Sequence, residues 1–177
     1  MSAGTNTSPS PKRRWFLKTA LAIAAVGGAV GGSIWWHRGL DDKGMTPHGR
    51  AVFRALASAI VGPMLPKDPA QRAASLDHYV DKLDQSIAGM PSAKRLQLSL
   101  LAGALANAPT RYLASGMWTS WDTVTDAEVL TALEKMRSAG SDAQHIVFVA
   151  CRAITCLTFF SQPDNWSLTG YPGPMPL

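Results

Sequence analysis

Cysteine is scarce in this chain: among 177 residues there are only Cys151 and Cys156. Both fall in one predicted helix, five positions apart, so their α-carbons are expected about 8 Å from each other. That separation is too large for an undistorted disulfide, and two small buried apolar residues are the simpler interpretation. The alternative is that one of the two bridges to a partner chain in an oxidising compartment. A Cys-x-x-Cys-His motif is missing, which excludes covalently attached haem.

Recognisable catalytic and ligand-binding motifs are also missing. The four histidines, His37, His48, His78 and His145, are scattered without the spacing of metal ligands on a helix face. There is no nucleophile elbow, no phosphate-binding loop and no dinucleotide fingerprint. We therefore predict no catalytic, cofactor-binding or metal-binding residues, and a chain that is not itself an enzyme. The competing hypothesis, a small stand-alone periplasmic enzyme such as a hydrolase, predicts turnover by the isolated chain.

Negative charge is missing from the first part of the chain. Residues 1–37 hold four of the 17 basic residues and no acidic one, which leaves 13 basic and 12 acidic residues in the rest. The formal charge of +5 therefore belongs largely to the leader. A nucleic-acid-binding surface needs basic residues gathered on one face, and the body of the chain shows no such cluster. We predict no binding to nucleic acid.

The basic residues of the leader form a recognisable pattern. Positions 12–18 read Lys-Arg-Arg-Trp-Phe-Leu-Lys, and Arg13, Arg14, Phe16, Leu17 and Lys18 resemble the export signal read by the twin-arginine translocase. That pathway moves proteins that are already folded, usually around a cofactor. Nothing further along this chain looks able to bind a cofactor. The combination suggests that the exported cargo is a partner protein.

An apolar segment follows the signal and ends the first predicted domain, residues 1–37. Residues 19–36 are 18 positions without a charge, which as a helix would extend about 27 Å, close to the thickness of a bilayer core. Cations precede it and Trp35 and Trp36 close it, which is typical of a positive-inside anchor. No Ala-x-Ala cleavage site follows Trp36. We expect a retained tether to the inner membrane with the body in the periplasm; the alternative is a cleaved signal.

The second predicted domain, residues 38–160, is expected to be a small all-α domain of about five helices. Proline after a capping residue, glycine stops and apolar spacing predict helices over 47–61, 69–88, 91–106, 125–139 and 142–160. The third is rich in leucine with little polar relief, so we expect it to be central. Asp142 is the expected cap of the fifth. That helix holds many β-branched residues that also suit a strand, but its length favours a helix.

Two tryptophans flank a short loop between the third and fourth predicted helices. Trp118 and Trp121 either pin this loop to its own core or serve as anchors for a partner protein. Pinning is the more common role of such residues.

The third region, residues 161–177, is predicted to be an extended arm rich in proline and glycine. Four prolines and two glycines in the last 15 residues cannot continue a helix, but they can form a stiff segment that loses little entropy on docking. The alternative is an arm that folds back over its own helices. As candidate partner-binding residues we take Trp166, Gly170, Tyr171, Pro172, Gly173 and Pro174.

This ending resembles the C-terminus of the gluconate 2-dehydrogenase subunit 3 family, in which an aromatic, small-polar, Pro, Trp stretch leads into Gly-Tyr-Pro-Gly-Pro. The leader and the early helix from Phe53 to Pro63 also look similar to that family. The resemblance covers the leader, one helix and the tail, and the residues that match in the tail are Phe159, Phe160, Pro163, Trp166, Gly170, Tyr171, Pro172, Gly173 and Pro174.

The resemblance implies a non-catalytic small subunit of a periplasmic flavin-dependent dehydrogenase of the glucose-methanol-choline type, acting on a sugar or an alcohol. FAD would belong to the large catalytic subunit, and haem c to a cytochrome c that accepts electrons. The large subunit of such a complex lacks an export signal and leaves the cytoplasm attached to the small one. This chain would thus be an export escort, a folding and stability partner, and a membrane tether. A free-standing membrane-anchored scaffold is the other alternative.

Overall fold

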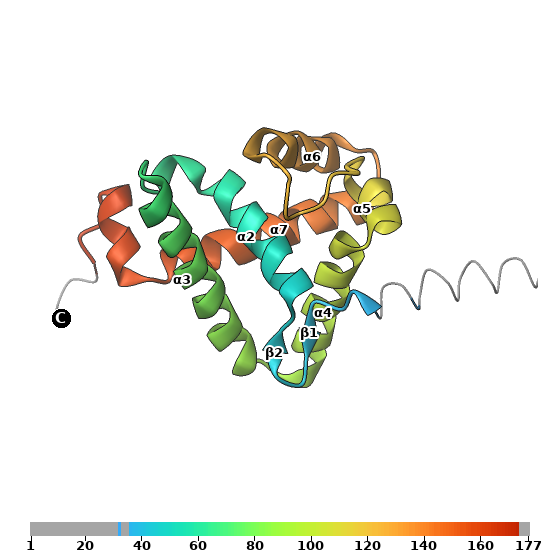
Figure 1. Cartoon of the computed structure of the whole chain (residues 1–177), viewed down its shortest axis with the longest axis horizontal. Helices are drawn as coiled ribbons and strands as arrows, with labels where there is room; N and C mark the ends of the chain where they lie inside the picture. The colour runs from blue at the N-terminus through green and yellow to red at the C-terminus, as the bar shows by residue number, and fades with distance from the viewer. Residues whose placement is uncertain (1–31, 33–35, 174–177) are drawn as a thin grey trace, which may run out of the picture.

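The computed structural model describes residue 32 and residues 36–173, and it confirms a small, mostly helical all-α domain (Figure 1). The predicted export signal at residues 13–18, most of the apolar segment and Pro174 lie outside the described residues. Within the described residues, six α-helices follow a short hairpin, and two 3₁₀ helices complete the fold. In chain order the elements are β1 (Leu40–Asp41), β2 (Gly44–Met45), α2 (Pro47–Ile60), η1 (Gly62–Met64), α3 (Pro69–Ala88), α4 (Ser92–Ala106), α5 (Ala108–Ser115), α6 (Asp126–Ser138), α7 (Asp142–Phe160) and η2 (Pro163–Thr169).

Side-chain caps begin three of the helices where the sequence predicts them. Thr46 accepts a hydrogen bond from the Gly49 amide at 3.2 Å and starts α2. Asp68 caps α3 in the same way, and Thr125 with Glu128 forms a reciprocal capping box at α6. The predicted cap of α7 is wrong. Asp142 is the first helical residue, and the cap position belongs to Ser141, whose side chain makes no capping bond.

The centre of the domain is α2, not the leucine-rich α4. Helix α2 contacts α3, α4, α6 and α7, and its Val52, Phe53 and Leu56 are almost completely buried. Helix α4 packs through only one face, because α2, α5 and the hairpin cover one side of it. Leu96 and Leu100 on its other side are 57% and 51% exposed. The prediction of a central third helix is therefore wrong.

Helix α5 is an element that the sequence pattern did not predict. Asn107 ends α4 and at once caps α5, since its side-chain oxygen accepts from the Thr110 amide at 3.3 Å. Pro109 occupies the first turn of α5, where a missing N–H costs nothing. The same Asn-Ala-Pro sequence that stops one helix therefore starts the next.

The hairpin holds the start of the domain tightly against α4. Gly39, just before β1, donates its amide to the Ser99 carbonyl at 3.2 Å, and Leu40 donates to the Ser99 hydroxyl at 3.2 Å. A methyl group at Gly39 would lie 2.2 Å from the Cβ of Ala102, so only glycine permits this approach. The backbone is thus fixed on the middle of α4 from residue 39 onward.

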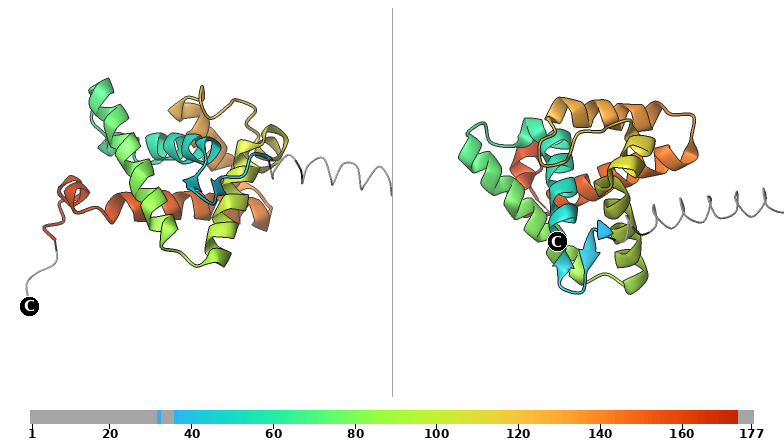
Figure 2. Two further views of the ribbon diagram at one scale, coloured as in Figure 1. Left: turned by 60° about the horizontal axis from the view of Figure 1, so that its bottom comes forward. Right: turned by 45° about the vertical axis from the view of Figure 1, so that its right-hand side comes forward.

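As far as residue 173, where the described residues end, the tail is not the extended arm that its prolines predict. Residues 163–169 form the 3₁₀ helix η2, which packs on α7 near the described end of the chain (Figure 2). Side chains of the tail donate to the last carbonyls of α7: Asn165 to Phe159 at 2.7 Å and Trp166 to Phe160 at 2.8 Å. These carbonyls have no partner within the helix, and satisfying them folds the tail back on its own domain.

Candidate functional site

The most extensive candidate surface is the outer face of α7. Ile146, Val149 and Leu157 are 66%, 48% and 72% exposed, and with the exposed Ala153 they follow one stripe at about 100° per residue. The opposite face of α7 is buried against α2 and α6. Contiguous exposed apolar surface of this kind marks sites of interaction with other molecules. We call the stripe Ile146, Val149, Ala153 and Leu157 the α7 face.

Among the described residues, α7 is also the one helix that is long and apolar enough to cross a membrane by length and composition alone. Its mean hydropathy is 1.5 over 18 residues, and 17% of that window is buried. The helix nevertheless packs on α2, α3, α5 and α6. We treat it as a part of the domain with one uncovered side.

A second candidate surface is an exposed aromatic pair. The rings of Tyr112 on α5 and Trp118 in the following loop stack with their centroids 4.6 Å apart. Their exposed fractions are 44% and 61%, and the neighbouring Leu113 is 75% exposed. Rigid exposed aromatic residues are frequent anchors of protein interfaces.

The buried guanidinium of Arg111 holds the loop that carries this pair. It donates to the carbonyls of Leu105, Ala106, Met117 and Trp118 at 2.8–3.3 Å. The first two carbonyls end α4, where a cation is favoured by the helix dipole. Burial lowers the pKa of Arg111, but a guanidinium stays charged at any physiological pH. Nothing in the sequence pattern indicated this role, because it depends on a bend between α4 and α5 that was not predicted.

The two loop tryptophans take different roles. Trp121 is 8% exposed and donates its indole N–H to the Leu105 carbonyl at 2.7 Å, so it pins the loop to the core. Trp118 points outward onto Tyr112 and is available to a partner. The pinning role is observed for Trp121, and a role of Trp118 as an anchor for a partner stays a prediction.

The predicted partner-binding residues from Trp166 to Gly173 follow the end of α7, and Pro174 lies outside the described residues. Trp166 is half-buried and packs edge-to-face on Tyr171, with the ring centroids 5.4 Å apart. Gly170 adopts a left-handed φ of 71°, which turns the chain. Tyr171 is 49% exposed and Pro172 is exposed as well. Their contact with a partner stays a prediction.

Cys151 and Cys156 are both free thiols, and their environments differ. Cys151 is completely buried, and burial raises the pKa of its thiol to about 12. A protonated, inaccessible thiol is inert, so Cys151 matches the structural interpretation. Cys156 is partly exposed in a groove of 470 Å³ between α6 and α7, and it alone could bridge to another chain.

The buried thiol of Cys151 is expected to make the domain less stable at alkaline pH. The native state holds the Cys151 proton up to about pH 12, whereas the unfolded thiol releases it above about pH 9. The free energy of unfolding therefore falls as the pH rises through this window, by about 1 kcal/mol between pH 9 and pH 10. Burial likewise raises the pKa of Tyr79, which adds to the loss above pH 10.

Urea unfolding at several pH values measures this effect. We expect Cys151→Ala to flatten the decline between pH 9 and pH 10, while Cys156→Ala keeps it because Cys151 is still present. Equal declines in the two variants would contradict the assignment to Cys151.

No metal-binding constellation is found within residues 36–173, where no three His, Cys, Asp or Glu side chains gather. His37 and His48 lie with their ring centroids 5.0 Å apart, and Asp77, the neighbour of His78, forms an ion pair with Arg54. The predictions of no catalytic, cofactor-binding or metal-binding residue are untested by this arrangement and stay predictions.

Comparisons of the chain with protein-family models, with curated proteins and with solved structures find no match in any of the three. The resemblance of the tail and leader to the gluconate 2-dehydrogenase subunit 3 family therefore stays a prediction.

Proposed function

We propose that this chain is a non-catalytic small subunit that binds a flavin-dependent dehydrogenase of the glucose-methanol-choline type and carries it to the periplasm. The partner holds FAD and oxidises a sugar or an alcohol, and a cytochrome c with haem c accepts the electrons. The chain itself contributes an export signal at Arg13 and Arg14, a membrane tether and a binding surface. The twin-arginine translocase and the inner membrane are its other contacts.

The uncovered α7 face is the observation that carries this proposal. Helix α7 has 19 residues, buries one side and exposes isoleucine, valine and leucine on the other. Contact of these side chains with water is unfavourable until a partner covers them. An enzyme working alone gains nothing from such a surface, whereas a subunit uses it for association. The aromatic pair Tyr112 and Trp118, held by Arg111, adds a second apolar contact.

Introducing negative charge on the α7 face tests the association directly. We expect Ile146→Glu with Leu157→Glu to raise the Kd for the flavoprotein at least about thirtyfold, equal to about 2 kcal/mol, because each change places a carboxylate in a dry contact. The two side chains are largely exposed in the free chain, so its own fold should tolerate the change. Binding is measured by titrating the detergent-solubilised chain with the flavoprotein purified from the same membranes.

The matched control is Leu96→Glu, which places the same charge on a leucine of α4 that is 57% exposed. It should leave the Kd within about threefold of the unmodified chain. If the α7 variant also bound normally, this face would not be the binding surface.

A further inference from the structure

The exposed side of α4 lies where the apolar N-terminal segment joins the domain. We propose that this side, defined by Leu96 and Leu100 together with Trp36, rests on the surface of a lipid bilayer. The inference rests on the proposed membrane tether, and it adds which face of the domain meets the lipid.

The first argument is the length of chain between the tether and the domain. The uncharged stretch of the sequence ends at Trp36, and Gly39 is already hydrogen-bonded to the Ser99 carbonyl of α4. Three residues reach at most about 10 Å. With residues 19–36 in the membrane, the middle of α4 has to lie within about 10 Å of the point where the tether leaves the apolar core. No spacer exists that could lift the domain away.

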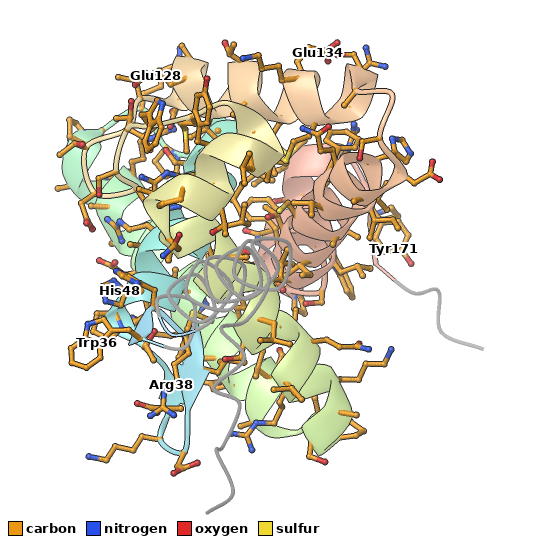
Figure 3. The ribbon with its side chains drawn as sticks, turned by 90° about the vertical axis from the view of Figure 1, so that its right-hand side faces the viewer. Trp36, Arg38, His48, Glu128, Glu134 and Tyr171 are labelled. Atoms are coloured by element: carbon orange, nitrogen blue, oxygen red, sulfur yellow. The ribbon has the colours of Figure 1, made fainter. Side chains whose placement is uncertain are left out.

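The second argument is the side chains that this geometry brings to the interface. Leu96 and Leu100 are one helical turn apart, and more than half of each is exposed. Trp36 is 80% exposed, and Figure 3 shows it with Arg38 and His48 beside the hairpin. Tryptophan is enriched at the level of the lipid headgroups, and leucines of an interfacial helix enter the boundary of the acyl chains. Lipid contact explains apolar exposure that packing within the domain does not.

The third argument is the charge of the first turn of α4. Lys94 and Arg95 lie there, with no acidic residue in that turn and no side-chain cap. The helix dipole disfavours cations at this end, so they lower the stability of the isolated helix. Lipid phosphates next to this turn offset that cost. The acidic residues nearby, Asp41 and Asp42, belong to the hairpin, where the Asp41 carboxylate accepts from the Lys43 amide at 2.8 Å.

The α7 face is longer and more apolar, but it is not the face assigned to lipid. The bonds of Gly39 and Leu40 tie the hairpin next to Trp36 directly to α4, whereas the main contacts of α7 are with α2, α3, α5 and α6. The α7 face is therefore left for the protein partner, and an experiment can distinguish it from the exposed side of α4.

Spin labels on single cysteines test the assignment in the full chain. The protein is reconstituted into vesicles of phosphatidylethanolamine and phosphatidylglycerol, with Cys156→Ala as the background; the buried, protonated Cys151 does not react. Labels are placed at Leu96→Cys and Leu100→Cys. Leu130→Cys on α6 is the matched control, since Leu130 is 50% and Leu100 51% exposed. Figure 3 shows α6, marked by Glu134, at the opposite end of the molecule from Arg38.

Collisions with oxygen, which concentrates in lipid, are compared with collisions with a water-soluble nickel chelate. We expect the oxygen-to-nickel ratio to be several-fold higher at positions 96 and 100 than at position 130. Equal ratios at all three positions, in a chain that resists a urea wash of the vesicles, would overturn the lipid contact and leave the tether intact. A chain removed by the urea wash would overturn both the tether and the lipid contact, but not the association with a flavoprotein. Labels at 96 and 100 shielded from both reagents when the flavoprotein is bound would assign this face to protein and contradict the inference.

Discussion

Replacing both arginines of the export signal, Arg13→Lys with Arg14→Lys, is expected to leave the dehydrogenase activity in the cytoplasm. The partner is proposed to have no export signal of its own, so it reaches the periplasm only when attached to this chain. The replacement keeps the positive charge of the leader, so the positive-inside rule still places the N-terminus in the cytoplasm. A loss of export therefore reports recognition of the arginine pair itself.

The measurement is dehydrogenase activity in periplasmic and cytoplasmic fractions, together with the amount of flavoprotein in each. The matched control is Lys18→Arg, which alters a basic residue of the same signal and keeps Arg13 and Arg14. We expect periplasmic activity to disappear in the double variant and to be retained in the control. Unchanged periplasmic activity in the double variant would show that the partner is exported independently, and the escort function would be wrong.

The largest effect on folding is expected at Arg111. Arg111→Met keeps much of the volume of the side chain but removes every hydrogen bond to the four carbonyls that it binds. Leu105 keeps the indole N–H of Trp121 as a donor, and the other carbonyls lose theirs. An unsatisfied buried group costs about 1–3 kcal/mol, so we expect a loss of about 3 kcal/mol or more in the free energy of unfolding. That is a large part of the stability of a small domain.

Urea unfolding of the unmodified chain and of Arg111→Met measures this loss. A lower unfolding midpoint with an unchanged dependence of the free energy on urea concentration reports a loss of stability. Arg111→Lys serves as the comparison, because a lysine keeps the charge but cannot donate to carbonyls on both sides of the bend. The free energy of unfolding of Arg111→Lys should lie between those of the unmodified chain and of Arg111→Met. A loss below about 1 kcal/mol in Arg111→Met would show that water replaces the guanidinium and that the clamp is not structural.

The helix starts of this fold were predictable because their signals are local. Thr46 before Pro47, Asp68 before Pro69 and Thr125 before Glu128 each place a capping side chain within reach of the amides that it satisfies. Such contacts need no knowledge of the rest of the chain. The all-α class follows from them and from the helical spacing of the apolar residues.

The arrangement of the helices was not predictable in the same way. The leucine-rich sequence of α4 predicts a core helix, yet more than half of Leu96 and of Leu100 is exposed because the fold offers this helix neighbours on one side only. The tail folds into η2 because Asn165 and Trp166 satisfy the last carbonyls of α7, a contact that proline content does not reveal. The α7 face likewise became visible only when the covered side of α7 was known. Each of these features depends on tertiary contacts.

The central claim is that this chain works through a partner, and co-purification from the membrane tests it most directly. The tagged full-length chain is isolated from solubilised membranes of cells that export it, and the absorbance and dehydrogenase activity of the product are measured. The account predicts a flavoprotein dehydrogenase in equal amount, with flavin absorbance and activity that vanish together when the tagged chain carries Ile146→Glu and Leu157→Glu. A colourless, solitary chain that still reaches the periplasm would contradict it.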